Sequence, residues 1–381
     1  MILFNSLTRS KENFTPLSKT EILIYVCGIT PNNASHLGHA FTYVSFDVLI
    51  RYLRYKGSSV NYLQNATDLN DSDDVITQAT AAGRTWEEEA SFWIDDFHKQ
   101  MDALCVLRPT KFVLATSVIK QIIEINKKLI NEKFAYTKNG NVYFRISKYK
   151  KYGKLSKFNS AQMLYISQDR GNDKNDPNKE NPLDFVLWFS DPLGPSWNSP
   201  WGKGRPGWHI ECSTMIYKYL GDSIDIHGGG RDLIYPHHEN EIAQSESFTG
   251  KKFVNIWMHT GMVLYEGEKM SKSLGNLILV SDLLKKHSPA AVRWLLLSHH
   301  YRAPWEYEEM EMAEIEGKVK KIQKVLSGIA SSQLPEERSQ FELLMDDDLN
   351  TPKVLELVED LVANGKTKDA RKMLEILGFK I

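Results

Sequence analysis

Cysteine is scarce in this sequence, since its 381 residues include only Cys27, Cys105 and Cys212. Three thiols do not form a disulfide framework, so each is a small buried side chain, a metal ligand or a nucleophile. Long apolar runs are also absent: none would cross a bilayer, and the first residues lack the apolar core of a signal peptide. We therefore expect a cytoplasmic protein without membrane contact. We also expect a monomer.

The sequence lacks an excess of charge of either sign, because 47 Lys and Arg residues are balanced by 48 Asp and Glu residues. A net charge of −1 argues weakly against a nucleic-acid partner, since local basic patches survive in a neutral protein. With 42% hydrophobic and 25% charged residues, the composition is that of an ordinary globular protein with room for two or three domains.

What the sequence does contain is a clear opening βα unit. An apolar strand is predicted over residues 21–27, and apolar residues at helical spacing run from Phe41 to Leu53 and close at Gly57. The loop 31–39 between them would place free backbone N–H groups at the carboxyl edge of a sheet, where phosphates bind. Two histidines, His36 and His39, fall at this edge.

A second motif, Lys269-Met270-Ser271-Lys272-Ser273, lies between two glycines near the end of the predicted sheet. A basic turn alone would be an ordinary solvated loop. Together, the His-Leu-Gly-His and Lys-Met-Ser-Lys-Ser sequences resemble the two signatures of class I aminoacyl-tRNA synthetases and related ligases. The resemblance implies activation of a carboxylic acid by ATP with Mg²⁺. It also implies that His36, His39, Lys269 and Lys272 stabilise the phosphate charge of the transition state.

The rest of the pattern predicts an α/β fold with a Rossmann-like parallel sheet that is interrupted by an insertion. We expect the first half of the catalytic domain at 1–109, beginning with an extended lead-in of about twenty residues, and the connective insertion at 110–200. The second half, with a zinc site and the Lys269 loop, would span 201–278, and a helical domain 279–381. Thr85 with Glu88 predicts a helix start, and Asn139-Gly140 predicts a hairpin.

Four scattered residues could bind a metal. His237 and Glu241 are four residues apart and would share one face of a helix. Added to Cys27 and Cys212, they form a reasonable zinc set, although buried cysteines are commonly plain apolar filler. Cys105 has no such partner and is expected to be filler.

Segments 25–30, 207–213 and 228–241 resemble the superfamily of cysteinyl-tRNA synthetases and mycothiol cysteine ligases. This resemblance implies that Cys27, Cys212, His237 and Glu241 bind zinc, and that the zinc receives the thiolate of L-cysteine. A zinc–thiolate bond would separate cysteine from serine. The resemblance also implies a cysteinyl-adenylate pocket lined by Cys27, Gly28, Ile29, Thr30, Thr42, Asn65, Ala66, Thr67, Trp208, Gly230, Arg231, Asp232 and Val263.

The two branches of the superfamily differ in the acceptor of cysteine. Segments 28–31 and 163–184, and an end at residue 381, resemble the mycothiol ligases. Segment 3–9, His227 and segment 239–246 resemble the tRNA enzymes. We predict transfer to the amine of glucosaminyl-inositol, with transfer to tRNA(Cys) as the alternative. A silent paralogue that binds nucleotide, RNA or a protein is disfavoured, because the sequence retains every phosphate-handling and metal-binding residue.

Overall fold

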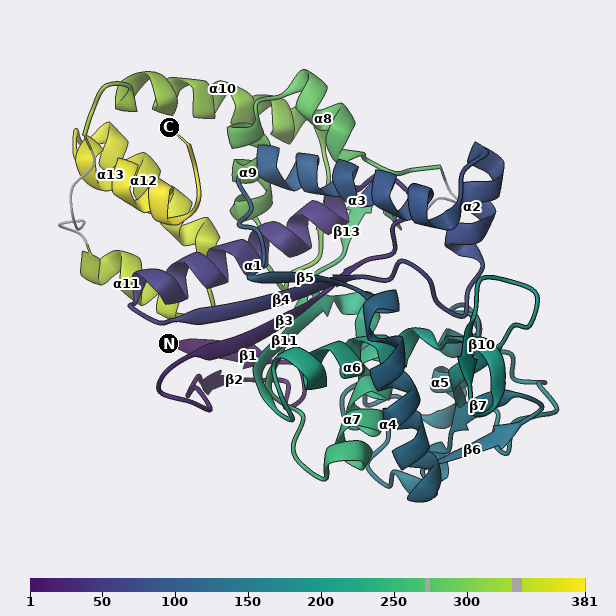
Figure 1. Cartoon of the computed structure of the whole chain (residues 1–381). Helices are drawn as coiled ribbons and strands as arrows, with labels where there is room; N and C mark the ends of the chain where they lie inside the picture. Colours follow the sequence, from purple (N-terminus) through teal and green to yellow (C-terminus); the bar gives the residue numbers. More distant parts are fainter. Residues whose placement is uncertain (271–274, 331–337, 381) are drawn as a thin grey trace.

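The computed structural model describes residues 1–270, 275–330 and 338–380. Its centre is a parallel sheet with the strand order β12-β11-β3-β4-β5 (Figure 1). The strands are β3 (Ile22–Ile29), β4 (Val60–Ala66), β5 (Lys111–Leu114), β11 (Ile224–Gly230) and β12 (Val254–Thr260). The expected α/β fold with a parallel sheet is confirmed.

Strand β3 lies in the middle of this sheet and is buried on both faces, as its almost continuous apolar sequence predicts. Because side chains alternate along a strand, Ile24 and Val26 pack into one hydrophobic cluster, while Tyr25 and Cys27 pack into another on the opposite face. Cys27 therefore faces a different set of helices from its neighbour Val26.

Helices cover both faces of the sheet (Figure 1). On one face lie α1 (Leu37–Tyr55) and α9 (Pro289–Ser298), and on the other lie α4 (Ile119–Asn131), α6 (Trp208–Tyr219) and α7 (Glu239–Thr249). Helix α1 begins after the carboxyl end of β3, as the opening βα unit predicts. Cys27, on the second face, points toward the side that carries α6 and α7.

Between β5 and β11 the chain forms a second, antiparallel sheet in the order β6-β7-β8-β10-β9. Its strands are β6 (Ala135–Lys138), β7 (Asn141–Phe144), β8 (Phe185–Ser190), β9 (Trp197–Ser199) and β10 (Gly202–Pro206). Asn139 and Gly140 join the first two with φ angles of 49° and 81°, so the predicted Asn-Gly hairpin is confirmed. Helix α5 (Ser160–Gln168) precedes β8.

The first twenty residues differ from the extended lead-in that we expected. Strands β1 (Ile2–Asn5) and β2 (Ser10–Asn13) form an antiparallel hairpin. The backbone N–H of Phe4 donates to Asp348 Oδ1 at 2.8 Å, and that of Ser6 donates to the carbonyl of Trp257 at 2.8 Å. The hairpin thus joins the parallel sheet to the C-terminal helices.

The remaining elements complete the two ends of the molecule. They are α2 (Asp74–Ala82), α3 (Trp86–Ala103), β13 (Val263–Tyr265), β14 (Glu268–Lys269), α8 (Val280–Lys286), β15 (Trp305–Glu306), α10 (Glu309–Leu326), α11 (Arg338–Asp346), α12 (Thr351–Ala363) and α13 (Thr367–Ile376). Thr85 caps α3 in the predicted capping box with Glu88. None of the helices in the described ranges has the length and apolar character needed to span a membrane.

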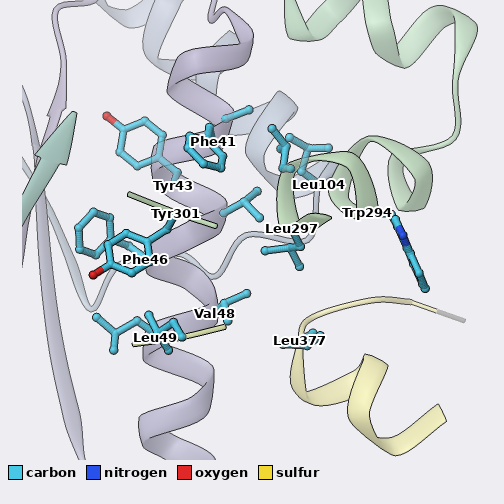
Figure 2. Close-up of a cluster of buried hydrophobic side chains, with 14 of the residues drawn as sticks. Phe41, Tyr43, Phe46, Val48, Leu49, Leu104, Trp294, Leu297, Tyr301 and Leu377 are labelled. Atoms are coloured by element: carbon cyan, nitrogen blue, oxygen red, sulfur yellow. The ribbon is translucent and has the colours of Figure 1, made fainter. Parts of the chain in front are cut away.

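A hydrophobic cluster joins α1 to the C-terminal helices (Figure 2). Phe41 and Val48 of α1 pack in the same cluster as Leu297 of α9 and Leu377 after α13. A buried ion pair between Asp47 of α1 and Arg293 of α9 lies within this apolar contact. The helix that carries the histidine motif at its start is therefore fixed along its length by packing.

Candidate active site

The two signature histidines cap the start of helix α1. Nδ1 of His36 accepts a hydrogen bond from the backbone N–H of Gly38 at 3.1 Å, and Nδ1 of His39 accepts from the backbone N–H of His36 at 3.3 Å. This is a capping box built from histidines, and the two rings stack with their centroids 3.9 Å apart. A Cβ on Gly38 would lie 2.9 Å from the His36 ring, so glycine makes room for the stack.

This capping arrangement fixes the tautomers of both rings. Each Nδ1 is an acceptor, so each ring carries its proton on Nε2. Burial lowers the pKa of His36 to about 4 and that of His39 to about 3, and both imidazoles are neutral at pH 7. The pair therefore offers neutral Nε2–H donors rather than positive charges.

Both histidines line a cavity of about 400 Å³ at the carboxyl edge of the parallel sheet. Sixteen of the residues predicted from the sequence line this cavity: Cys27, Gly28, Ile29, Thr30, His36, His39, Thr42, Asn65, Thr67, Trp208, Cys212, Gly230, Asp232, His237, Val263 and Lys269. Its volume falls in the range of ordinary small-ligand sites. Residues from five separate segments thus meet at the place where open α/β sheets bind ligands.

Four predicted residues stand apart from the cavity wall. Ala66 pairs with Ile29 in the sheet and packs into the hydrophobic cluster beneath α1, so its side chain does not reach the ligand space. Arg231 lines a neighbouring cavity instead. Glu241 is fully buried behind the wall. Lys272 lies outside the described residues.

The structure adds wall residues that the sequence reasoning missed. Thr260 ends strand β12, and its hydroxyl lies 2.8 Å from that of Thr42. Its position at a strand end was a usable signal, because residues at the ends of β3, β4 and β11 also line the cavity. Arg170, from the loop after α5, also lines the cavity and donates to Asp232 at 2.9 Å.

Asp232 forms ion pairs with two cationic residues of the wall. Its Oδ2 lies 2.9 Å from Arg170 Nη2 and 3.5 Å from Lys269 Nζ. These two cations hold the pKa of Asp232 below its ordinary value, although burial opposes this effect. Lys269 is half exposed at the edge of the cavity, within the sequence motif that resembles the second signature.

The four predicted metal ligands meet beside this cavity, and three of them line it. One ligand atom from each of Cys27, Cys212, His237 and Glu241 lies within 4.8 Å of the others, and all four residues are buried. His237 Nε2 is 3.1 Å from Glu241 Oε1, and Cys27 Sγ is 3.8 Å from the same oxygen. Two thiols, an imidazole and a carboxylate are a donor set that suits zinc.

A second set of four, Cys27, His227, His238 and Glu241, is equally compact. The first set is favoured because Cys27, Cys212 and His237 line the cavity, whereas neither His227 nor His238 does. In addition, Nδ1 of His209 lies 3.0 Å from Nδ1 of His237. Burial lowers the pKa of His209, so this neutral ring can accept the Nδ1 proton of His237 and leave His237 Nε2 free to bind a metal.

The protonation states of the first set also suit a cation. Burial raises the pKa of Cys212, but hydrogen bonds with Cys27 and His237 outweigh it and lower the pKa to about 6. Against burial, the negative charges of Cys212 and Glu241 raise the pKa of His237 to about 10. The set therefore holds a thiolate and a carboxylate, and a metal ion would displace the proton from His237.

The sequence is similar to known proteins along almost its whole length. Residues 13–317 match the family model described as tRNA synthetases class I (C) catalytic domain. The cysteine–tRNA ligase of Thermodesulfovibrio yellowstonii is 42% identical over 385 residues, which cover 95% of this chain and 78% of that protein. The cysteine–tRNA ligase of Thermococcus onnurineus is 42% identical over 409 residues, which cover 100% of this chain and 84% of that protein. The chain belongs to the cysteine–tRNA ligase family.

Solved structures agree with the fold of this family. The Mycobacterium tuberculosis methionyl-tRNA synthetase in complex with methionyl-adenylate has a TM-score of 0.64 and 17% sequence identity, covering 94% of this chain and 82% of that one. At this identity the likeness concerns the fold alone. As a class I synthetase family member, the chain is an ATP-dependent amino acid ligase.

Proposed function

We propose that this protein activates L-cysteine with ATP and transfers it to tRNA(Cys). What supports the proposal is one cavity whose wall carries both the histidine pair and the thiol and imidazole groups of Cys27, Cys212 and His237. The relatives named cysteine–tRNA ligase favour the tRNA acceptor, which was the alternative in our sequence analysis. The preference for glucosaminyl-inositol finds no support in them. That preference relied on partial resemblances in two short segments and on the position of the last residue.

The first reaction would join cysteine to AMP. A carboxylate oxygen of cysteine attacks the α-phosphorus of ATP, and the bond to pyrophosphate breaks. The Nε2–H groups of His36 and His39 would donate to phosphate oxygens as charge builds on them, and Lys269 would reach the same oxygens from the cavity edge. Mg²⁺ would accompany ATP.

The second reaction would transfer the cysteinyl group. A ribose hydroxyl of the tRNA 3′ end attacks the carbonyl carbon of cysteinyl-AMP, AMP leaves with the electron pair of the broken C–O bond, and the hydroxyl loses its proton. At this stage the wall must hold the adenylate still. Trp208 would help, since its ring lines the cavity and stacks on His237 with centroids 4.3 Å apart.

Selection of cysteine would depend on the four metal ligands. Held by Cys27, Cys212, His237 and Glu241, a zinc ion would supply a bond to the substrate thiolate that the hydroxyl of serine cannot match. The cytoplasmic location and the monomeric state stay predictions.

A labelled-cysteine experiment tests the acceptor. Purified protein, ATP and Mg²⁺ are incubated with tRNA(Cys) and glucosaminyl-inositol together, and the label is followed. We expect an alkali-labile ester on tRNA. Label in a small, alkali-stable amide would overturn the proposal in favour of the amine acceptor, and absence of cysteine-dependent ATP–pyrophosphate exchange would overturn both.

A further inference from the structure

Between β5 and α6, a stretch that the structure describes in full, only Arg170 lines the active-site cavity. It lies in the loop between α5 and β8, next to the antiparallel sheet, and its side chain also lines two neighbouring cavities. Within the described ranges, the one hydrogen bond of this side chain is to Asp232. Arg170 therefore links the antiparallel-sheet region to the edge of the parallel sheet.

The backbone around Arg170 is held by hydrogen bonds. The N–H of Arg170 donates to the carbonyl of Ser167 at 3.1 Å, and that of Asn172 donates to the same carbonyl at 3.0 Å. Gly171 between them has a φ of +87°, a left-handed conformation that glycine adopts without strain. Nδ2 of Asn172 also donates to the carbonyl of Pro182 at 3.0 Å, which ties the turn to the segment before β8. Arg170 thus extends from a closed turn of the backbone.

Asp232 follows β11, and its carboxylate has two cationic partners that use the same oxygen. Oδ2 lies 2.9 Å from Arg170 Nη2 and 3.5 Å from Lys269 Nζ. Oδ1 faces Gly230, where a Cβ would lie 2.7 Å away. Within the described ranges, no backbone N–H and no hydroxyl group donates to this carboxylate. Among the described residues, its charge is therefore balanced by Arg170 and Lys269.

The proposed reaction makes different demands on the two cations. Lys269 has to reach the phosphate oxygens of ATP, and it must leave Asp232 to do so. Removing the counter-ion of a partly buried carboxylate is unfavourable, because water replaces the lost partner only incompletely. Arg170 reduces this cost, since it keeps the Asp232 charge paired after Lys269 has moved. By sharing the oxygen, Arg170 also weakens the attraction between Asp232 and Lys269 while ATP is absent.

We propose that Arg170 is a positioning residue for the activation of cysteine: it holds the Asp232 carboxylate so that Lys269 is free to move to the phosphates of ATP. Without Arg170, the ion pair between Asp232 and Lys269 would tighten, and fewer molecules would have Lys269 at the phosphates. The inference rests on the proposed role of Lys269 in adenylation. It predicts a slower chemical step with unchanged cysteine binding, because Arg170 forms no hydrogen bond with the metal ligands in the described ranges.

Cysteine-dependent ATP–pyrophosphate exchange tests this role. For Arg170→Gln we expect kcat to fall about tenfold and the KM for cysteine to stay within about twofold of the wild type. Arg170→Lys should keep most of kcat, because it keeps the charge. Arg145→Gln is the matched control, since Arg145 lies between β5 and α6 as well, pairs with Glu180 at 2.6 Å and lies outside the three cavities.

Three results would overturn the inference. The first is a wild-type kcat in Arg170→Gln. The second is an equal loss of kcat in Arg170→Gln and Arg145→Gln, which would assign the effect to the fold of this region. The third is an equal loss in Arg170→Gln and Arg170→Lys, which would show that the charge of Arg170 does not act on Asp232.

Adding Arg170→Gln to Lys269→Gln decides whether Arg170 acts through Lys269. We expect the added substitution to change kcat less than about twofold, because no lysine remains to be released. A further loss of about tenfold would show that Arg170 acts on ATP directly, and it would overturn the positioning role. Wild-type protein without cysteine-dependent exchange would contradict the proposed function and this inference with it. An active wild type that Arg170→Gln matches would contradict the inference alone.

Discussion

His227 Nε2 lies 2.9 Å from Glu241 Oε2, and both side chains are fully buried. The other carboxylate oxygen of Glu241 faces His237. His227 therefore holds the Glu241 carboxylate in the orientation that a metal needs. Replacing His227 by Leu should lower zinc affinity by about 10- to 100-fold, as loss of an outer-shell partner commonly does. Competition with a chromophoric chelator measures this, and zinc affinity within twofold of the wild type would show that Glu241 is oriented by other groups.

Removal of a direct ligand should have a larger effect. In Cys212→Ser we expect zinc content and cysteine-dependent ATP–pyrophosphate exchange to be lost together, with exchange reduced more than about 100-fold. Cys105→Ser is the matched control, because Cys105 lies outside the metal set and outside the cavity wall. Full exchange activity in zinc-free Cys212→Ser protein would contradict the metal assignment.

The histidine cap should make stability depend on pH. The folded-state pKa values of His36 and His39 are about 4 and 3, below the ordinary value of 6.5. The unfolded chain therefore takes up protons first as the pH falls below 6.5, and the free energy of unfolding decreases. Above pH 6.5 both states are neutral, and this contribution is fully present.

Urea unfolding at pH 7 and pH 5 measures this effect. Each histidine should contribute a loss of about 2 kcal/mol at pH 5. His36→Asn keeps a side chain that can cap the helix but cannot titrate, so its loss between the two pH values should be smaller by about that amount. An unchanged pH dependence in this variant would show that His36 is not neutral in the folded protein.

The buried pair of Asp47 and Arg293 should contribute to stability through the cost of separating it. Arg293 also donates to the carbonyls of Leu104 and Leu377, at 2.7 and 2.9 Å. Arg293→Met would leave Arg51, 2.8 Å away, as the remaining ion-pair partner of the buried Asp47 carboxylate, and we expect a loss of about 3 kcal/mol in urea unfolding. The half-exposed pair of Arg108 and Asp102 gives the comparison: Arg108→Met should cost less than about 1 kcal/mol. Equal effects of the two substitutions would contradict this view of the α1 contact.

The elements that could be predicted from sequence are those with a local signal. Thr85 and Glu88 satisfy backbone N–H groups that any helix start leaves free, and Asn139-Gly140 adopts the positive φ angles that a tight hairpin requires. The β1–β2 hairpin has no such turn signal, and the side chain that anchors it, Asp348, lies 344 residues from Phe4 along the chain.

The same distinction holds for the site. Strand ends and helix starts place residues at one sheet edge, so most of the cavity wall could be anticipated from the sequence. The predicted helix at His237 begins later, since Tyr235 has an extended backbone and α7 starts at Glu239; the two ligands nevertheless meet. Arg231 lines the neighbouring cavity rather than the predicted one. Which cavity its side chain enters depends on packing between distant segments, and sequence spacing does not predict this.

The alternation along β3 limits how this strand can change during evolution. Val26 belongs to the core under α1, and its neighbour Cys27 belongs to the metal set on the other face. Insertion or deletion of a single residue before Cys27 would exchange the two faces of the strand. The Cys27 thiol would then point into the core under α1, and Val26 would take its place in the metal set. Changes in length within this strand should therefore be tolerated only in pairs, whereas apolar substitutions on the α1 face leave the chemistry of the opposite face intact.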